Sequence, residues 1–147
     1  MSSSVPGAAD LSYEAIQVGT EAGFSCVVTA EDVSAFANLS GDHNPLHVDP
    51  DYARTTRLGR CIVHGMFLAG LFSRLLGMYL PGRRCLYLSQ NADFVHPVYV
   101  GDRLRVAGVV QQKQDVTRSL VIRTSIVNEA GVTVVRGKAH AIVLDNP

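Results

Sequence analysis

A chain of 147 residues is long enough to bury a hydrophobic core, and its length fits one domain. Apolar residues make up 47% of the chain and charged residues 18%, a balance that is typical of a globular protein and excludes extensive disorder. The 13 Lys and Arg residues equal the 13 Asp and Glu residues in number. This balance gives no basic field, so we expect no nucleic acid among the partners.

The three cysteines and the N-terminal residues give the first indications of cellular location. Cys26, Cys61 and Cys85 form no C-x-x-C pair, so we expect reduced, partly buried thiols in a cytoplasmic protein. Residues 1–10 have neither the positive charge nor the apolar stretch of a signal peptide. We expect residues 1–17 to be a flexible leader of a single domain that spans residues 1–147.

The first predicted elements surround a polar stretch. Residues 24–28 favour a short strand. Thr29 and Asp32 have the spacing of a capping box, which starts a helix that runs to the turn at Ser40. Asp49 and Pro50 are typical of the N-cap and first position of another helix. Residues 40–48 are therefore expected to form a loop between two helix ends.

The next stretch, residues 61–80, is long and apolar enough to suggest a membrane span. His64, Ser73 and Arg74 interrupt it, and a central Arg alone costs about 2.5–3.5 kcal/mol on membrane insertion scales. We therefore predict a buried helix over residues 63–79, apolar on nearly every side, and no membrane partner. Pro81 and Gly82 end it.

The pattern then changes to strands, predicted over residues 86–94, 103–112, 119–128 and 132–144. Three long consecutive strands with short links indicate an antiparallel sheet. The prediction is an α+β fold in which this sheet curls around the long central helix, with the first strand joining an edge. A second copy of the chain would cover the open sheet edges, so we expect a homodimer.

Asp42 and His47 are the candidate catalytic residues. A carboxylate and an imidazole on one constrained loop can hold a water between them, and acid–base catalysis needs such a pair. Asn44 can anchor the loop or orient a ligand. If Gly65 lies in the first turn of the buried helix, its N–H is free to bind a ligand carbonyl, as in an oxyanion hole.

Each of these residues also has a plainer interpretation. Asp42 can cap a turn, His47 and His64 can be structural histidines, and Ser73 can be a satisfied core serine. Asp42, His43 and His47 could be read as metal ligands. Because Pro45 prevents a regular helix between the two histidines, we expect no metal. A Ser-His-Asp hydrolase is disfavoured because the chain contains no G-x-S-x-G elbow.

A resemblance to a known family now decides between these interpretations. The run Ser40-Gly41-Asp42-His43-Asn44-Pro45-Leu46-His47, with Phe36 before it and Ala53 after it, resembles the hydratase-2 motif of the (R)-specific enoyl-CoA hydratases in the MaoC-like dehydratase family. Residues 62–66, residues 87–90 with Phe94, and residues 97–102 are similar to that family too. The likeness runs from about residue 18 to the end of the chain.

The resemblance implies a dimeric hot-dog fold that acts on coenzyme A thioesters in fatty acid metabolism, without a metal or redox cofactor. It carries over Asp42 and His47 as the catalytic pair and Gly65 as carbonyl donor, with Asn44 and Ser73 as substrate-binding residues. The implied reaction is reversible hydration of trans-2-enoyl-CoA to (R)-3-hydroxyacyl-CoA. Three alternatives stay open: a dehydratase acting on carrier-protein thioesters, a hot-dog thioesterase, and a non-catalytic acyl-binding partner subunit.

Overall fold

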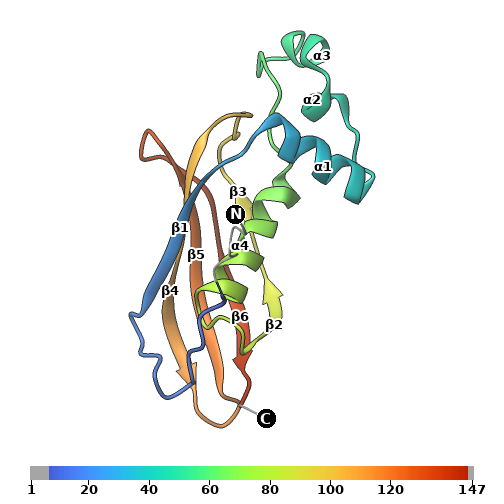
Figure 1. The fold of residues 1–147 in the computed structure, drawn as a ribbon. Coiled ribbons are helices and arrows are strands. Elements are labelled where there is room, and N and C mark those ends of the chain that lie inside the picture. Colours follow the sequence, from blue (N-terminus) through green and yellow to red (C-terminus); the bar gives the residue numbers. More distant parts are fainter. Residues whose placement is uncertain (1–6, 146–147) are drawn as a thin grey trace, which may run out of the picture.

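The computed structural model describes residues 7–145, which form four helices and six strands (Figure 1). In chain order these elements are β1 (Glu21–Val27), α1 (Ala30–Ser40), α2 (Pro45–Val48), α3 (Pro50–Arg54), α4 (Gly65–Met78), β2 (Cys85–Gln90), β3 (Asp93–Phe94), β4 (Arg103–Gln114), β5 (Ser119–Asn128) and β6 (Thr133–Val143).

The strands form one antiparallel sheet in the order β1-β4-β5-β6-β2, with β3 paired to β6. The antiparallel prediction and the edge position of the first strand are confirmed. The strand predicted over residues 86–94 is broken, because Asn91 leaves the ladder and its side-chain oxygen accepts from the Lys138 amide at 2.8 Å. Gly137 makes this possible, since a Cβ there would lie 2.0 Å from the Asn91 carbonyl oxygen.

Helix α4 lies against the concave side of the sheet (Figure 1). Its buried side chains are spaced at helical intervals and belong to Leu68, Phe72, Leu75 and Leu76. Gly108 on β4 lets the helix approach closely, because a Cβ there would lie 3.0 Å from Leu75 Cδ2. The predicted burial of this helix holds for one face only, because the Met66 side chain is 68% exposed. The sheet covers one face of α4 and leaves the other open.

Helices α1, α2 and α3 gather at one end of the molecule, beyond the first turn of α4 (Figure 1). The predicted capping box of α1 is confirmed, because Thr29 Oγ1 accepts from the Asp32 amide and Asp32 Oδ2 accepts from the Thr29 amide. Asp49 caps α3 as predicted. The segment 40–48 is not entirely a loop, because Pro45 occupies the first position of the short helix α2, where its missing N–H costs nothing.

Residues 7–17 do not form the flexible leader expected from the sequence. Ile16 is fully buried and Tyr13 is 4% exposed, and both belong to the main hydrophobic core. The Ala9 amide donates to the Met78 carbonyl at 2.9 Å, and Arg84 Nε donates to Asp10 Oδ1 at 2.6 Å. These contacts attach the segment to the end of α4 and to the residues that lead into β2. The rest of the predicted leader, residues 1–6, lies outside the described residues.

The arrangement is the hot-dog fold: a curved antiparallel sheet packed on one long helix. Within residues 7–145, no helix is long and apolar enough to span a membrane.

Burial of residues 7–17 yields a prediction for stability. Ile16→Ala removes a fully buried side chain, so we expect the free energy of unfolding to fall by about 2–5 kcal/mol in chemical denaturation. Val18→Ala is the matched control, because Val18 is 61% exposed and its truncation should change stability by less than about 0.5 kcal/mol. Equal stabilities of the two variants would mean that the segment is not part of the core.

Candidate active site

Asp42 is held by a turn that follows α1. Gly41 ends the helix in the left-handed conformation, with φ of 81°, and donates its N–H to the Ala37 carbonyl at 2.9 Å. Ser40 Oγ accepts from the Asp42 amide at 3.1 Å, and Asp42 Oδ1 accepts from the Asn44 amide at 3.1 Å. One carboxylate oxygen is thus used to shape the loop, while the other, Oδ2, lies 4.0 Å from the Nε2 atom of His64. The Asp42 side chain is half-exposed.

His47 lies in the short helix α2, two residues after its start. Asn44 caps this helix through its side-chain oxygen, which accepts from the Leu46 amide at 3.0 Å. His47 Nδ1 lies 2.8 Å from the Ile62 carbonyl oxygen. Since a carbonyl only accepts, Nδ1 is the protonated nitrogen of this bond, and in the neutral ring Nε2 keeps the lone pair. The Nε2 atom is therefore the one available to accept a proton.

Asp42 and His47 lie together, and a third residue, His64, joins them. One ligand-capable atom from each of the three lies within 4.8 Å of the others. The rings of His47 and His64 stack with centroids 3.9 Å apart, and His64 Nε2 lies 2.9 Å from the Asp42 carbonyl oxygen. The interpretation of His64 as a structural histidine agrees with its burial and its bond to a backbone carbonyl, but the sequence did not place it against the other two residues.

The same three residues do not fit a metal ion well. His64 Nε2 carries the proton of its bond to the Asp42 carbonyl, so this nitrogen presents no lone pair towards the cluster. Its 4.0 Å separation from Asp42 Oδ2 is also wider than two ligands on one zinc ion require, about 3.3 Å for bonds of 2.0–2.1 Å. The arrangement favours proton transfer over metal binding.

Gly65 lies in the first turn of α4, which is the condition under which its N–H could bind a ligand carbonyl. It occupies the first helical position, after the N-cap residue His64, and its N–H has no hydrogen-bond acceptor among the described residues. The ring of Phe94 covers it, since a Cβ at position 65 would lie 3.2 Å from that ring. An acceptor bound to this N–H would lie at the positive end of a helix of 14 residues.

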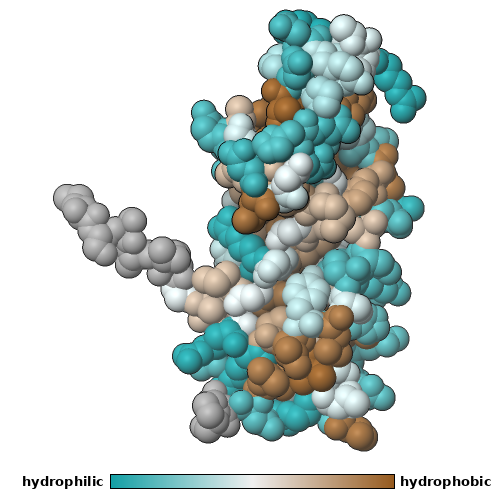
Figure 2. All heavy atoms as spheres, turned by 90° about the vertical axis from the view of Figure 1, so that its right-hand side faces the viewer, coloured by the Kyte–Doolittle hydropathy of each residue, from teal (hydrophilic) through white to brown (hydrophobic). Residues whose placement is uncertain are grey.

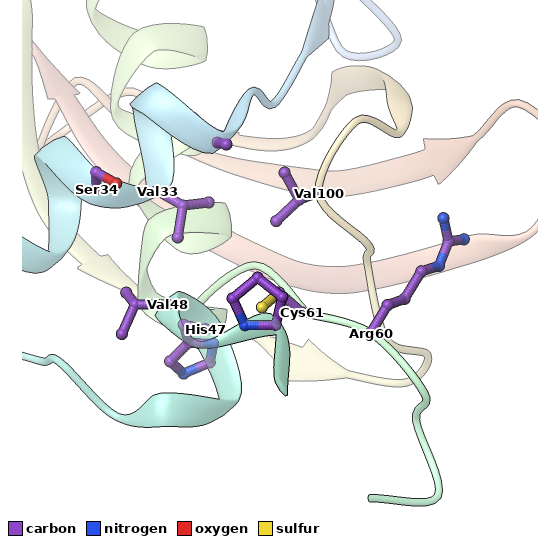
Figure 3. A pocket seen from close by; sticks show the side chains of 9 residues that line it. Val33, Ser34, His47, Val48, Arg60, Cys61 and Val100 are labelled. Atoms are coloured by element: carbon purple, nitrogen blue, oxygen red, sulfur yellow. The ribbon is translucent and has the colours of Figure 1, made fainter. Parts of the chain in front are cut away.

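Two hollows border these residues. The first, of about 280 Å³, is lined by His47 together with Ala30, Val33, Ser34, Val48, Pro50, Arg60, Cys61 and Val100. Figure 3 shows His47 beside Val48 and Cys61, with Val33 on α1 and Val100 on the segment before β4. The second, of about 360 Å³, follows the open face of α4 and is lined by Met66, Ala69, Gly70, Ser73, Tyr87, Gln90, Ala92 and Phe94.

Ser73 is therefore not beside the acid–imidazole pair. It lies eight residues after Gly65, which is about 12 Å along the helix axis. Ser73 and the Phe94 ring over Gly65 line the same second hollow. Asn44 uses its side-chain oxygen to cap α2, so its observed role is to anchor the loop.

Cys61 lies in the first hollow, near His47, but it is a poor nucleophile. Burial raises the pKa of its thiol, and the nearby carboxylate of Asp49 raises it further. A thiol with a raised pKa stays protonated at neutral pH, and the thiolate is the reactive form. All three cysteines are free and partly buried, as the sequence predicted.

The fold and the site together define a hot-dog protein with an acid–imidazole pair beside an open helix start. The family model described as MaoC like domain matches residues 14–131. The chain belongs to this MaoC-like family, as the hydratase-2 motif indicated.

The most informative relatives are similar to this chain over most of its length. The (R)-specific enoyl-CoA hydratase of Aeromonas caviae is 43% identical over 88% of this chain and 96% of its own. A mitochondrial 3-hydroxyacyl-[acyl-carrier-protein] dehydratase of Arabidopsis thaliana is 34% identical over 80% of this chain and 71% of its own. The solved structure of the R-hydratase PhaJ1 from Pseudomonas aeruginosa superposes with a TM-score of 0.89 at 34% identity, covering 93% of this chain and 88% of that one.

Proposed function

We propose that this chain is an (R)-specific enoyl-CoA hydratase, a hydro-lyase that adds water reversibly to trans-2-enoyl-CoA to give (R)-3-hydroxyacyl-CoA. The observation that carries the proposal is the placement of Asp42, His47 and the Gly65 amide around the start of α4. The 43% identity to a hydratase from Aeromonas caviae supports the same reaction.

In this proposal a water lies between the Asp42 carboxylate and the lone pair of His47 Nε2. One of the two groups takes a proton from the water as its oxygen bonds to C3 of the substrate. The electron pair of the C2–C3 double bond moves towards the thioester carbonyl. A proton is then delivered to C2 by the same residue or by the other, so that water is added without any change of oxidation state.

The developing charge on the thioester oxygen needs a donor, and Gly65 is proposed for this role. The amide is held by the helix and its position is fixed before substrate arrives, so no reorganisation is needed during the reaction. Ser73 is proposed to contact the acyl chain from the second hollow. Asn44 is proposed to contact substrate at the loop in addition to its observed capping role.

The reaction as written uses no metal or redox cofactor, and coenzyme A enters as part of the substrate. We propose that the enzyme is cytoplasmic and that the chain forms a single domain, since one continuous hydrophobic cluster includes residues from Tyr13 to Val143.

The second candidate is a 3-hydroxyacyl dehydratase that takes carrier-protein thioesters. The same residues would catalyse the reverse reaction, and the Arabidopsis thaliana relative favours it. Turnover of one 3-hydroxyacyl group on coenzyme A and on a carrier protein, measured side by side, distinguishes the two. Thioesterase activity and a non-catalytic partner subunit are less favoured, because the acid and the histidine of the motif are both present.

We also propose a homodimer. Strand β2 is an edge of the sheet, and Leu86 and Leu88 on it are 45% and 55% exposed. Met66 on α4 and Phe94 on β3 are 68% and 48% exposed. Figure 2 looks onto this side of the molecule and shows apolar patches between polar ones. A second copy paired along β2 would cover these side chains and the open face of α4.

The acid–imidazole pair is tested with two substitutions that preserve its hydrogen bonds. Asp42→Asn keeps an oxygen for the Asn44 amide, and His47→Asn keeps an N–H for the Ile62 carbonyl. We expect kcat for crotonyl-CoA hydration to fall about 10²–10⁴-fold in each, because acid–base catalysis is lost. His43→Gln, on the same loop, is the control. Loss of enoyl absorbance is the measurement, and wild-type rates in both variants would remove the pair from the mechanism.

The carbonyl donor is tested by Gly65→Ala. The added methyl meets the Phe94 ring at 3.2 Å and obstructs approach to the N–H, so kcat/KM should fall by about tenfold or more. Gly77→Ala in the same helix is the matched control, because nothing lies within 4 Å of its added Cβ. The control should keep full activity and gain about 0.5–1 kcal/mol of stability. Full activity of Gly65→Ala would exclude the proposed donor.

The dimer is tested by sedimentation equilibrium. The wild-type mass should be twice the 15.8 kDa of the chain. Leu88→Asp should shift the distribution towards monomer, because it places a charge in the covered edge. Val116→Asp, at a β4–β5 turn position that is 94% exposed, should not. A wild-type mass of one chain would contradict the proposal.

A further inference from the structure

Outside the proposed catalytic pair, His64 is a buried residue that contacts both of its members. Its ring is 2% exposed and stacks on His47 with an interplanar angle of 27°. Its Nε2 atom donates to the Asp42 carbonyl at 2.9 Å, although the two residues are 22 positions apart. The Phe36 ring packs against the His64 ring from another side, and the two ring centroids lie 4.8 Å apart.

Stability alone does not explain a histidine at this position. His64 Nδ1 is buried and has no hydrogen-bond partner among the residues that the structure describes. A buried polar atom without a partner costs free energy, and an apolar ring in this space between Phe36 and His47 would avoid that particular cost. The histidine supplies one thing that an apolar ring does not, the N–H that reaches the Asp42 carbonyl.

The position of this bond matters because the Asp42 side chain itself is half-exposed and stands on a turn. The hydrogen bonds that shape the turn are all local: the Asp42 amide donates to Ser40 Oγ, and the amides of Gly41 and Asn44 donate to Ala37 and Asp42. The bond from His64 is the long-range contact that ties the Asp42 backbone to the buried start of α4. It therefore determines how the carboxylate stands relative to His47 and to the Gly65 amide.

We infer that His64 is a positioning residue for catalysis: its Nε2–H holds the Asp42 backbone, and its ring supports the His47 ring, so that the pair meets the substrate at a fixed geometry. The inference rests on the hydration reaction proposed above. His64 does not touch the reacting atoms in this scheme, and its effect passes through Asp42 and His47. A misplacement of a catalytic group by about 1 Å can cost 10²-fold in rate.

Two substitutions separate the two contacts. His64→Phe keeps a flat ring against His47 and removes the donor, and His64→Gln keeps a donor near the Nε2 position and removes the ring. We expect His64→Phe to lower kcat about 10–100-fold with KM changed less than about threefold, since positioning acts on the chemical step. His64→Gln should recover most of the loss. His140→Gln is the matched control, because His140 is an exposed residue on β6.

A double-variant comparison excludes a merely structural role. If His64 acts through Asp42, then adding His64→Phe to Asp42→Asn should lower kcat by no more than about twofold further, because residues that act as a unit are not additive. Thermal melting of every variant reports folding, so a kcat loss without a matching loss of melting temperature supports positioning.

The outcomes distinguish this inference from the function it rests on. A wild-type enzyme that fails to hydrate crotonyl-CoA overturns the proposed function and this inference together. A wild-type enzyme that hydrates it, with His64→Phe folded and equally fast, overturns the inference alone. Full additivity of the two substitutions also overturns it, as does a His64→Gln variant that is folded and no faster than His64→Phe.

Discussion

The candidate site depends on the four residues before and at the start of α4, residues 62–65. Ile62 supplies the carbonyl that orients His47, His64 donates to the Asp42 carbonyl, and Gly65 presents the open amide. This short segment is fixed on its other side, where the Val63 amide donates to the Val98 carbonyl at 2.8 Å and Ile62 forms a bridge with Tyr99. The scaffold thus holds the polar loop through two hydrogen bonds, each of which joins a histidine side chain to a backbone carbonyl.

The features that could be predicted from the sequence are those determined by near neighbours. The capping box at Thr29, the cap at Asp49 and the alternation of residues 119–128 are local patterns, and the structure has them where expected. The hydratase-2 motif is local as well, since Asp42 and His47 are five residues apart on one turn and one short helix. Their convergence follows once Gly41 ends α1 and Asn44 starts α2.

The features that were missed depend on distant contacts. Residues 7–17 are rich in small and polar side chains, and only the tertiary structure shows that Tyr13 and Ile16 enter the core. The break between β2 and β3 requires Gly137, which is 46 positions from Asn91. The contact of His64 with Asp42 uses a backbone carbonyl as acceptor, and every residue has one, so no pattern of side chains marks it. Candidate side chains could therefore be identified from the sequence, whereas the backbone carbonyls that bind them could not.

The two halves of the site differ in how firmly they are held. Gly65 belongs to a helix whose Leu68 and Phe72 are buried against the sheet, and Phe94 packs directly over it. A side chain at position 65 would crowd the Phe94 ring, which would have to shift, and would also narrow the approach of an acceptor to the N–H. Asp42 lies on the turn that follows α1, and its side chain is half-exposed. A thioester carbonyl bound at Gly65 would accept from a rigidly held N–H, whereas the water would meet the Asp42 carboxylate on the more exposed side of the site. In the positioning role inferred above, the orientation of the Asp42 carboxylate on that exposed side then depends on the buried His64.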